Sequence, residues 1–379
     1  MNPTLEALFI GPTFFLSFLI LANIQRANVK ASYWLSGFIF CIFLIQLDAP
    51  LCSIGLNKNF SFLNDFIGLS NFVVAPVFYF SILYYVKPKR RWKKTDYLHF
   101  LFPFLILLLL VANHWLADEP SPKVQPEFVA MSVLVFVVLF CTYISLYCIQ
   151  SFLLIHRYQK NLHLYSSNIE VIDLKWLQQV SICVMFIATL WVLDIAFGLS
   201  EKSIFYSILS SLSTFLGICF IGYHALKQKE IYPFASEEQK EIESLISENE
   251  NTDFVKKKLI PDEQLIDLKT SLIRLMETQK PFLEAELSLV RLAQQLDISP
   301  HLLSYVINSG FGENFYQLVN RYRIEEAQKL IADVQMNHLS LLGIAYEVGF
   351  NSKTVFNTTF KKVTGQTPSD YKKTVQPKN

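Results

Sequence analysis

Two short stretches near the end of the chain each place polar, hydrogen-bonding side chains at helical spacing. The first set is His301, Ser304, Tyr305 and Asn308, and the second is Lys353, Thr354, Asn357, Thr358, Lys361 and Lys362. An Asn amide can bond an adenine edge in pairs, a Ser hydroxyl can bond either type of base, and Lys attracts phosphate. These residue types predict two helix faces that read double-stranded DNA.

A repeated apolar pattern positions these two faces. The apolar positions are Leu289, Leu292 and Leu296 in the first copy and Leu341, Ile344 and Val348 in the second. Both runs have the spacing of one face of a short helix. Each run breaks, at Asp297 and at Gly349, and a Ser that can cap a new helix follows as Ser299 or Ser352. The pattern predicts two helix-turn-helix units, with a positive φ at Gly349.

Three aromatic residues of the second copy, Phe350, Phe356 and Phe360, fall on its inner face, and we expect them in the core. The second copy is also the more basic one, because residues 352–379 contain six Lys and a single acidic residue, Asp370. Phosphate attraction supplies most non-specific affinity, so this copy should anchor the DNA. An alternative for either copy is that it only braces the other.

Longer motifs carry a family resemblance. Residues 314–331 read NFYQLVNRYRIEEAQKLI, and residues 344–373 read IAYEVGFNSKTVFNTTFKKVTGQTPSDYKK. The order A-x-E-x-G-F, F-x-x-x-F-K and T-G-x-T-P-x-x-Y resembles the C-terminal DNA-binding domain of the AraC/XylS family of bacterial transcription regulators. The resemblance is confined to residues 281–379. It implies sequence-specific binding to double-stranded DNA. A second copy of the chain, as a homodimer, and RNA polymerase are further candidate partners.

Residues 314–334, between the two copies, read as one helix of about 20 residues and about 30 Å. That length is close to one turn of B-DNA, about 34 Å, so both faces would enter successive major-groove segments. Arg321 and Arg323 on this helix pair either with phosphates or with the neighbouring Glu325 and Glu326.

The first part of the chain has the composition of a membrane domain. The chain is 52% hydrophobic with 33 Phe and 17% charged residues, and the charges are sparse before Gln228. Its apolar stretches are each long enough to cross a bilayer as a helix. The predicted spans are Leu5–Leu21, Ser32–Ile54, Leu63–Val86, Tyr97–Leu116, Phe128–Ile155, Val180–Leu199 and Ser203–His224.

Basic residues concentrate in alternate loops, most densely in KPKRRWKK at 87–94, whereas a loop such as the one with Asp118 and Glu119 is acidic. Basic loops stay in the cytoplasm. The seven spans therefore place the N-terminus outside a bacterial inner membrane and deliver the helix-turn-helix pair to the compartment that holds DNA.

Three polar side chains, Asp48, Asp194 and His114, lie at outer depths of otherwise apolar spans. A carboxylate in lipid is costly, so it usually faces the bundle interior and serves a function. We expect these residues to line the pocket of a sensor for a ligand or stimulus that the sequence does not name. The alternative is that they hydrogen-bond between helices and hold the bundle together.

The predicted fold is all-α, with four parts in chain order. These are a seven-helix transmembrane sensor in 1–228, an acidic linker in 229–261, an amphipathic helix in 262–280 and the paired helix-turn-helix units in 281–379. The amphipathic helix either packs on its own domain or forms a dimer contact.

No catalytic motif accompanies this organisation. The sequence holds no Gly-rich phosphate loop, no Cys/His cluster with metal spacing and no nucleophile motif, so neither an enzyme nor a cofactor is expected. Intramembrane aspartyl proteases resemble one another in a GxGD-type motif, with Gly before the Asp. Here Leu47 and Leu193 precede the two intramembrane Asp residues, so an aspartyl protease is disfavoured. The alternative function is a membrane transporter or channel with a regulatory cytoplasmic helical domain, and it predicts Gly- or Pro-broken spans in both halves.

Overall fold

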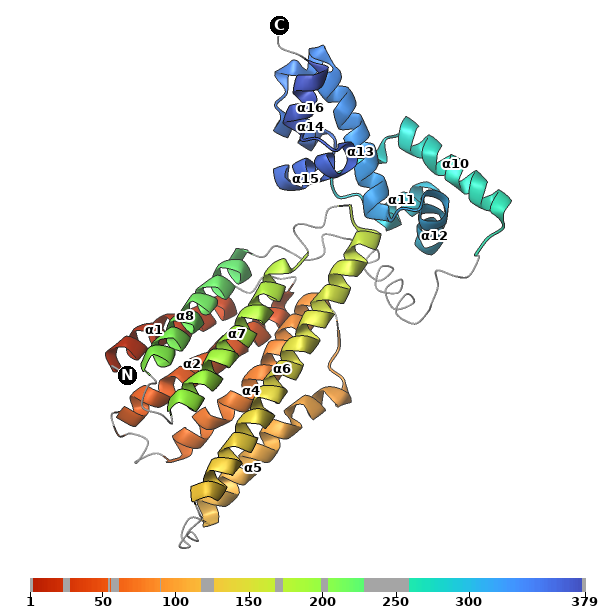
Figure 1. The fold of residues 1–379 in the computed structure, drawn as a ribbon. Helices are drawn as coiled ribbons and strands as arrows, with labels where there is room; N and C mark the ends of the chain where they lie inside the picture. The colour runs from red at the N-terminus through yellow and green to blue at the C-terminus, as the bar shows by residue number, and fades with distance from the viewer. Residues whose placement is uncertain are drawn as a thin grey trace. The chain divides into compact units, whose positions relative to one another are not determined.

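The computed structural model describes residues 3–22, 28–53, 55, 61–88, 90–116, 126–167, 173–198, 204–227 and 259–376. Every regular element in these ranges is an α- or 3-10 helix, which confirms the all-α prediction (Figure 1). The chain divides into two compact units. Residues 1–156 and 174–231 form the first unit, and residues 157–173 and 232–379 form the second. The boundaries of the four predicted parts stay a prediction, and residues 229–258 of the predicted linker lie outside the described ranges.

The first unit is a helical bundle whose helices coincide with the predicted spans. They are α1 (Pro3–Ala22), α2 (Val29–Ser53), α4 (Ser61–Val86), α5 (Leu101–Leu116), α6 (Pro126–Tyr165, shared with the second unit), α7 (Lys175–Gly198) and α8 (Ile204–Lys227). A 3-10 turn over Lys94–Phe100 leads into α5. Helix α2 packs along α1 and α4, and α8 packs against α7 and α1 (Figure 1).

This bundle exposes large apolar side chains and buries several serines among its apolar interior residues. Large side chains such as Phe15, Leu109 and Leu139 are about as exposed as surface residues of a soluble protein. The Ser17 hydroxyl, by contrast, is buried and donates to the Ser36 carbonyl at 3.0 Å, and the Ser36 hydroxyl donates back to the Ser17 carbonyl at 2.9 Å. Small residues that bond across a helix pair are typical of helices packed in lipid.

Within the described ranges, four helical segments are long and apolar enough to cross a membrane. They are Val29–Asp48, Phe66–Val86, Lys94–Ala112 and Val137–Tyr165. Two shorter apolar helices cover Phe9–Ala22 and Lys175–Leu190. The apolar helices are compatible with membrane insertion, while the count of seven spans stays a prediction.

The second unit holds short helices around two cores. Its helices are α10 (Asp262–Thr278), α11 (Leu289–Gln295), α12 (Pro300–Phe311), α13 (Phe315–Ala332), α14 (Leu341–Glu347), α15 (Lys353–Thr364) and α16 (Pro368–Val375). Short 3-10 turns lie at Pro281–Leu283 and Val334–His338. The first core joins α10, α11 and α12 to the start of α13, and the second joins α14, α15 and α16 to its end.

Helix α10, predicted as amphipathic, packs on its own unit. Leu272, Leu275 and Met276 are buried in the first core. The Lys269 ammonium donates to the Gly310 carbonyl at 2.5 Å and lies over the Phe311 ring. Of the two alternatives for this helix, packing against its own domain is the one found.

Candidate DNA-binding surface

Serine caps start all four short helices of the two helix-turn-helix units. Ser288 and Ser340 cap α11 and α14, and Ser299 and Ser352 cap α12 and α15. The Ser299 hydroxyl accepts from the Leu302 N–H, and the Ser352 hydroxyl accepts from the Thr354 N–H, each at 3.2 Å. An N-cap satisfies one of the free N–H groups of the first turn. The predicted caps at Ser299 and Ser352 are therefore confirmed.

Buried apolar side chains fix the orientation of both recognition helices. Leu303, Val306 and Ile307 of α12 are buried in the first core. Phe356 and Phe360 of α15 are buried in the second, together with Phe350, which confirms the prediction for all three aromatic residues. Gly312 ends α12 and Gly365 ends α15, each with a positive φ. The two helices are therefore presented in the same way, each with one face buried and the other outward.

The polar face of α15 is fully outward. All six residues predicted to contact DNA on this helix are exposed: Lys353, Thr354, Asn357, Thr358, Lys361 and Lys362. Lys361 and Lys362 lie in its last turn, where the helix dipole favours a cation. A surface of this kind combines hydrogen-bonding groups with mobile positive charge, as DNA recognition requires.

The polar face of α12 is less exposed. Asn308 is exposed, whereas His301, Ser304 and Tyr305 are half-buried. The Asn308 amide donates to the Ser304 hydroxyl across one helical turn at 3.4 Å. The structure thus gathers the four predicted residues on one helix face, and their contact with bases stays a prediction.

The turn of the second unit is built around Gly349. Its φ is +91°, which confirms the predicted positive value. A Cβ at this position would lie 2.8 Å from the carbonyl oxygens of Phe282 and Leu283 and 3.0 Å from Nε of Arg323. Glycine is therefore required here both for the backbone conformation and for the close approach of the 281–283 turn. Sequence spacing indicated the first reason and gave no signal of the second.

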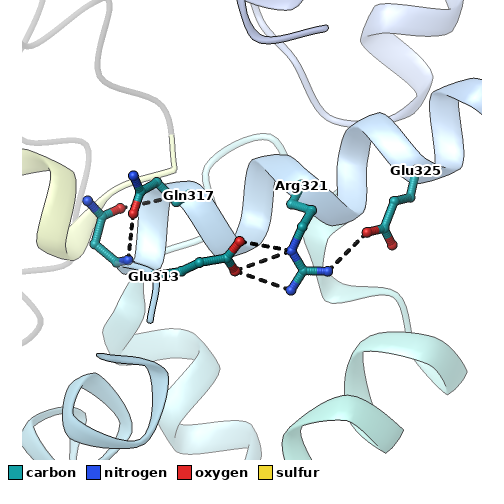
Figure 2. Close-up of polar contacts among 5 residues, drawn as sticks. Glu313, Gln317, Arg321 and Glu325 are labelled. Atoms are coloured by element: carbon teal, nitrogen blue, oxygen red, sulfur yellow. Dashed lines mark hydrogen bonds and ion pairs between the residues drawn. The ribbon is translucent and has the colours of Figure 1, made fainter. Parts of the chain in front are cut away.

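Helix α13 begins with a reciprocal cap and carries a half-buried charge network. The Asn314 N–H donates to the Gln317 amide oxygen, and the Gln317 N–H donates to the Asn314 side chain, each at 2.9 Å. Figure 2 shows the Arg321 guanidinium between two carboxylates, 3.0 Å from Glu313 and 3.0 Å from Glu325. Of the two predicted roles for Arg321, local pairing with Glu325 is the one found.

For Arg323, the two predicted roles are both wrong. Its side chain is 1% exposed, and it points between the two cores rather than toward solvent, so it cannot reach phosphate. Nε donates to the Phe282 carbonyl at 2.7 Å, and Nη2 donates to the Glu284 carbonyl at 2.8 Å. The guanidinium also lies over the Phe350 ring, 5.6 Å from its centroid. Burial lowers the pKa of Arg323 to about 10.

Of the three residues predicted to line a sensor pocket, the structure describes the side chain of Asp48 alone. Asp48 is exposed on α2, and the side chains of Asp194 on α7 and His114 on α5 lie outside the described ones. A separate cavity of about 70 Å³ lies among α2, α4, α6, α7 and α8. Its walls are almost wholly apolar, with Phe38 and Phe78 among them. A sensing role for Asp48, Asp194 and His114 stays a prediction.

Comparison with known proteins defines the class of the C-terminal part. A family described as "Helix-turn-helix domain" matches residues 292–374, the stretch that holds α12 to α15 and most of α11 and α16. This match and the geometry of the two capped units make this part a DNA-binding helix-turn-helix domain.

Two curated relatives are regulators named for the same domain. HTH-type transcriptional regulator GlxA of Rhizobium meliloti (strain 1021) is 27% identical over 27% of this chain and 31% of its own length. Uncharacterized HTH-type transcriptional regulator YtdP of Bacillus subtilis (strain 168) is 30% identical over 24% of this chain and 11% of its own. The chain thus spans less than a third of each curated relative. The C-terminal domain of AraT, a response regulator from Geobacillus stearothermophilus, is a solved structure with 30% identity over 31% of this chain and 88% of that chain, with a TM-score of 0.25.

Proposed function

We infer that this chain is a membrane-bound, one-component transcription regulator. Its cytoplasmic AraC/XylS-type domain binds double-stranded DNA sequence-specifically, and its helical first unit acts as the sensor that controls this binding. The observation that carries the inference is the pair of Ser-capped recognition helices on two cores joined by α13. Helix α13 is 18 residues long, about 27 Å, so it suits two faces that enter successive major-groove segments.

The membrane location rests on the character of the first unit. Its outward Phe and Leu side chains and its inward serine bonds suit lipid on the outside of the bundle. The basic stretch at 87–94 and Lys227 at the end of α8 favour the cytoplasmic side for these segments. We place seven spans in the inner membrane, with the N-terminus outside and the DNA-binding domain in the cytoplasm.

Genome-wide mapping of DNA bound by the full-length protein tests the inference. A single sequence motif shared by the bound fragments, with two half-sites about one helical turn apart, is the expected result. Bound fragments without a shared motif, or no enrichment over a chain truncated after residue 231, would exclude sequence-specific regulation.

Asn357 and Lys361 should contribute to DNA affinity in different ways. Asn357→Ala removes a group placed to contact a base, so it should cost about 1–3 kcal/mol and change the preferred sequence at one position. Lys361→Ala should weaken binding to all sequences and reduce the slope of log affinity against log salt by about one. Fluorescence anisotropy with mapped and scrambled DNA at several salt concentrations measures both. Equal losses on both DNAs for Asn357→Ala would rule out base reading at this position.

Reporter fusions should distinguish the two sides of the membrane. A reporter active only in the cytoplasm should be active when fused after Lys94 or Lys229 and silent when fused after Glu119. A reporter active only outside should give the opposite pattern, because basic loops are retained in the cytoplasm. An inverted pattern would place the segment after Lys229 outside the membrane, where the DNA-binding domain could not reach DNA.

A further inference from the structure

Helix α6 contributes residues to both compact units. It runs over 40 residues, about 60 Å, whereas a bilayer requires about 20 residues. Its residues through His156 belong to the first unit, and Arg157–Asp173 belong to the second. A single stretch of continuous helix therefore leads from the predicted membrane bundle into the unit that holds the helix-turn-helix domain.

The last residues of this stretch are packed into the second unit. Tyr165 is 3% exposed and belongs to the first helix-turn-helix core, with Leu164 packed against it. The His163 ring meets the Tyr316 ring of α13 edge to face, with centroids 5.0 Å apart. We name residues 164–167 the docking segment.

Backbone pairing fixes the docking segment to the strand-like stretch before α11. Ser166 and Ser288 form an antiparallel bridge. The Ser167 N–H donates to the Leu287 carbonyl at 3.3 Å, and the Ser167 hydroxyl donates to the same carbonyl at 2.8 Å. Ser288 is also the N-cap of α11, so the docking segment adjoins the residue that starts the first helix-turn-helix unit.

Arg323 joins this contact to both cores. Nη2 donates to the Ser167 hydroxyl at 3.2 Å, and Nη1 approaches the Ser167 carbonyl at 3.4 Å. In α13, Phe315, Leu318 and Val319 belong to the first core, and Ile324 begins the second. Arg323 thus lies where α13 passes from one core to the other, and Ser167 supplies part of its hydrogen bonding.

We propose that the docking segment is the contact through which the membrane half controls DNA binding. When it is docked, it completes the hydrogen bonds of Arg323 and holds the two helix-turn-helix units at one spacing. Because two faces on one chain bind DNA best when their spacing is fixed in advance, docking favours the DNA-binding state. A change in α6 that withdraws the docking segment would remove these hydrogen bonds to Arg323, loosen the spacing of the two helix-turn-helix units and weaken DNA binding. The inference rests on the proposed function.

A reversible crosslink tests the contact and its effect in one protein. Residues opposed in an antiparallel bridge have Cα atoms about 4.5–5.5 Å apart, within the range of a disulfide. The test uses the full-length Ser166→Cys/Ser288→Cys variant in membrane vesicles, with a protease site inserted in its 229–258 stretch. The protein is first oxidised with oxidised glutathione and then cleaved. The two fragments should then stay joined after cleavage, and they should separate with reductant. Ser166→Cys/Ser369→Cys is the matched pair and should not join.

The effect on DNA is measured with the fragment most enriched in the genome-wide mapping. The oxidised form should bind it about fivefold or more tightly than the reduced form of the same variant, which also controls for loss of the Ser288 cap. Ser167→Ala should bind about fivefold more weakly than wild type, and Ser369→Ala should bind normally.

Three results would overturn the proposal, and they are distinguishable. Failure of the Ser166→Cys/Ser288→Cys pair to join would show that the contact does not form. A crosslink that leaves DNA affinity equal in the oxidised and reduced forms would show that the contact does not control binding. Absence of DNA binding by wild-type protein would refute the proposed function, and the inference with it, whatever the crosslink shows.

Discussion

Gly349→Ala is expected to destabilise the second unit by about 3 kcal/mol or more. The substitution forces a side chain into a left-handed backbone conformation, where φ is +91°, at about 1–3 kcal/mol. It also drives the new Cβ to within 2.8 Å of two backbone carbonyl oxygens, in the 281–283 turn. Overpacking of this kind costs a further about 1–3 kcal/mol because the backbone must shift.

Gly365→Ala is the matched control. Gly365 also has a positive φ, +80°, but a Cβ there would meet nothing within 4 Å. This variant should therefore lose only the backbone contribution of about 1–3 kcal/mol, without the steric cost. The five Trp residues all lie outside the second unit, so we would follow its unfolding in urea by pulse proteolysis of the full-length protein, detected through a C-terminal tag. Equal midpoints for the two variants would refute the steric argument.

Arg323→Ala is expected to be the most damaging single truncation on α13, at about 3–5 kcal/mol. It leaves a cavity between the two cores and removes the donors of the buried Phe282 carbonyl and the part-buried Glu284 carbonyl. Unsatisfied buried acceptors and lost packing each cost about 1–3 kcal/mol or more. DNA affinity should fall as well, because the two helix-turn-helix units lose the side chain that packs between their cores.

Arg321→Ala provides the comparison, two residues away on the same helix. Its ion pairs with Glu313 and Glu325 are about one-third exposed, because the side chains are 30% exposed for Arg321, 26% for Glu313 and 44% for Glu325. Pairs of this kind contribute about 0–1 kcal/mol. The same proteolysis assay should therefore show a much smaller loss of stability for Arg321→Ala than for Arg323→Ala, although the two arginines look alike in the sequence. A loss for Arg323→Ala no larger than that for Arg321→Ala would contradict the assigned burial of Arg323.

Local sequence patterns predicted much of the second unit because its helices have local signals. Ser299 and Ser352 each precede an apolar run, which is a local signal for a helix start. Phe356 and Phe360 are four residues apart, the spacing of one buried helix face. The seven apolar stretches likewise coincide with helices, since length and hydropathy are local properties. The membrane assignment, the DNA contacts and the sensor residues remain predictions.

Long-range contacts could not be predicted in the same way. Arg323 looks like a surface residue in its helix, and its carbonyl partners at Phe282 and Glu284 lie about forty positions away in sequence. Ser167 lies still farther away, within what reads as an ordinary loop between two predicted membrane spans. One weak signal existed: Arg323 is two residues from Arg321, so the two cannot both project from the same face of α13.

The shared helix α13 also limits how this domain can change during evolution. Each residue added to an α-helix rotates the remainder of the helix by about 100° and advances it by about 1.5 Å. A single insertion between Val319 and Ile324 would therefore swing one recognition helix to another side of the DNA while the other stayed in place. Descendants of this chain should accordingly tolerate substitutions on the outer face of α13 and conserve its length, because that length sets the phase between the two DNA-reading faces.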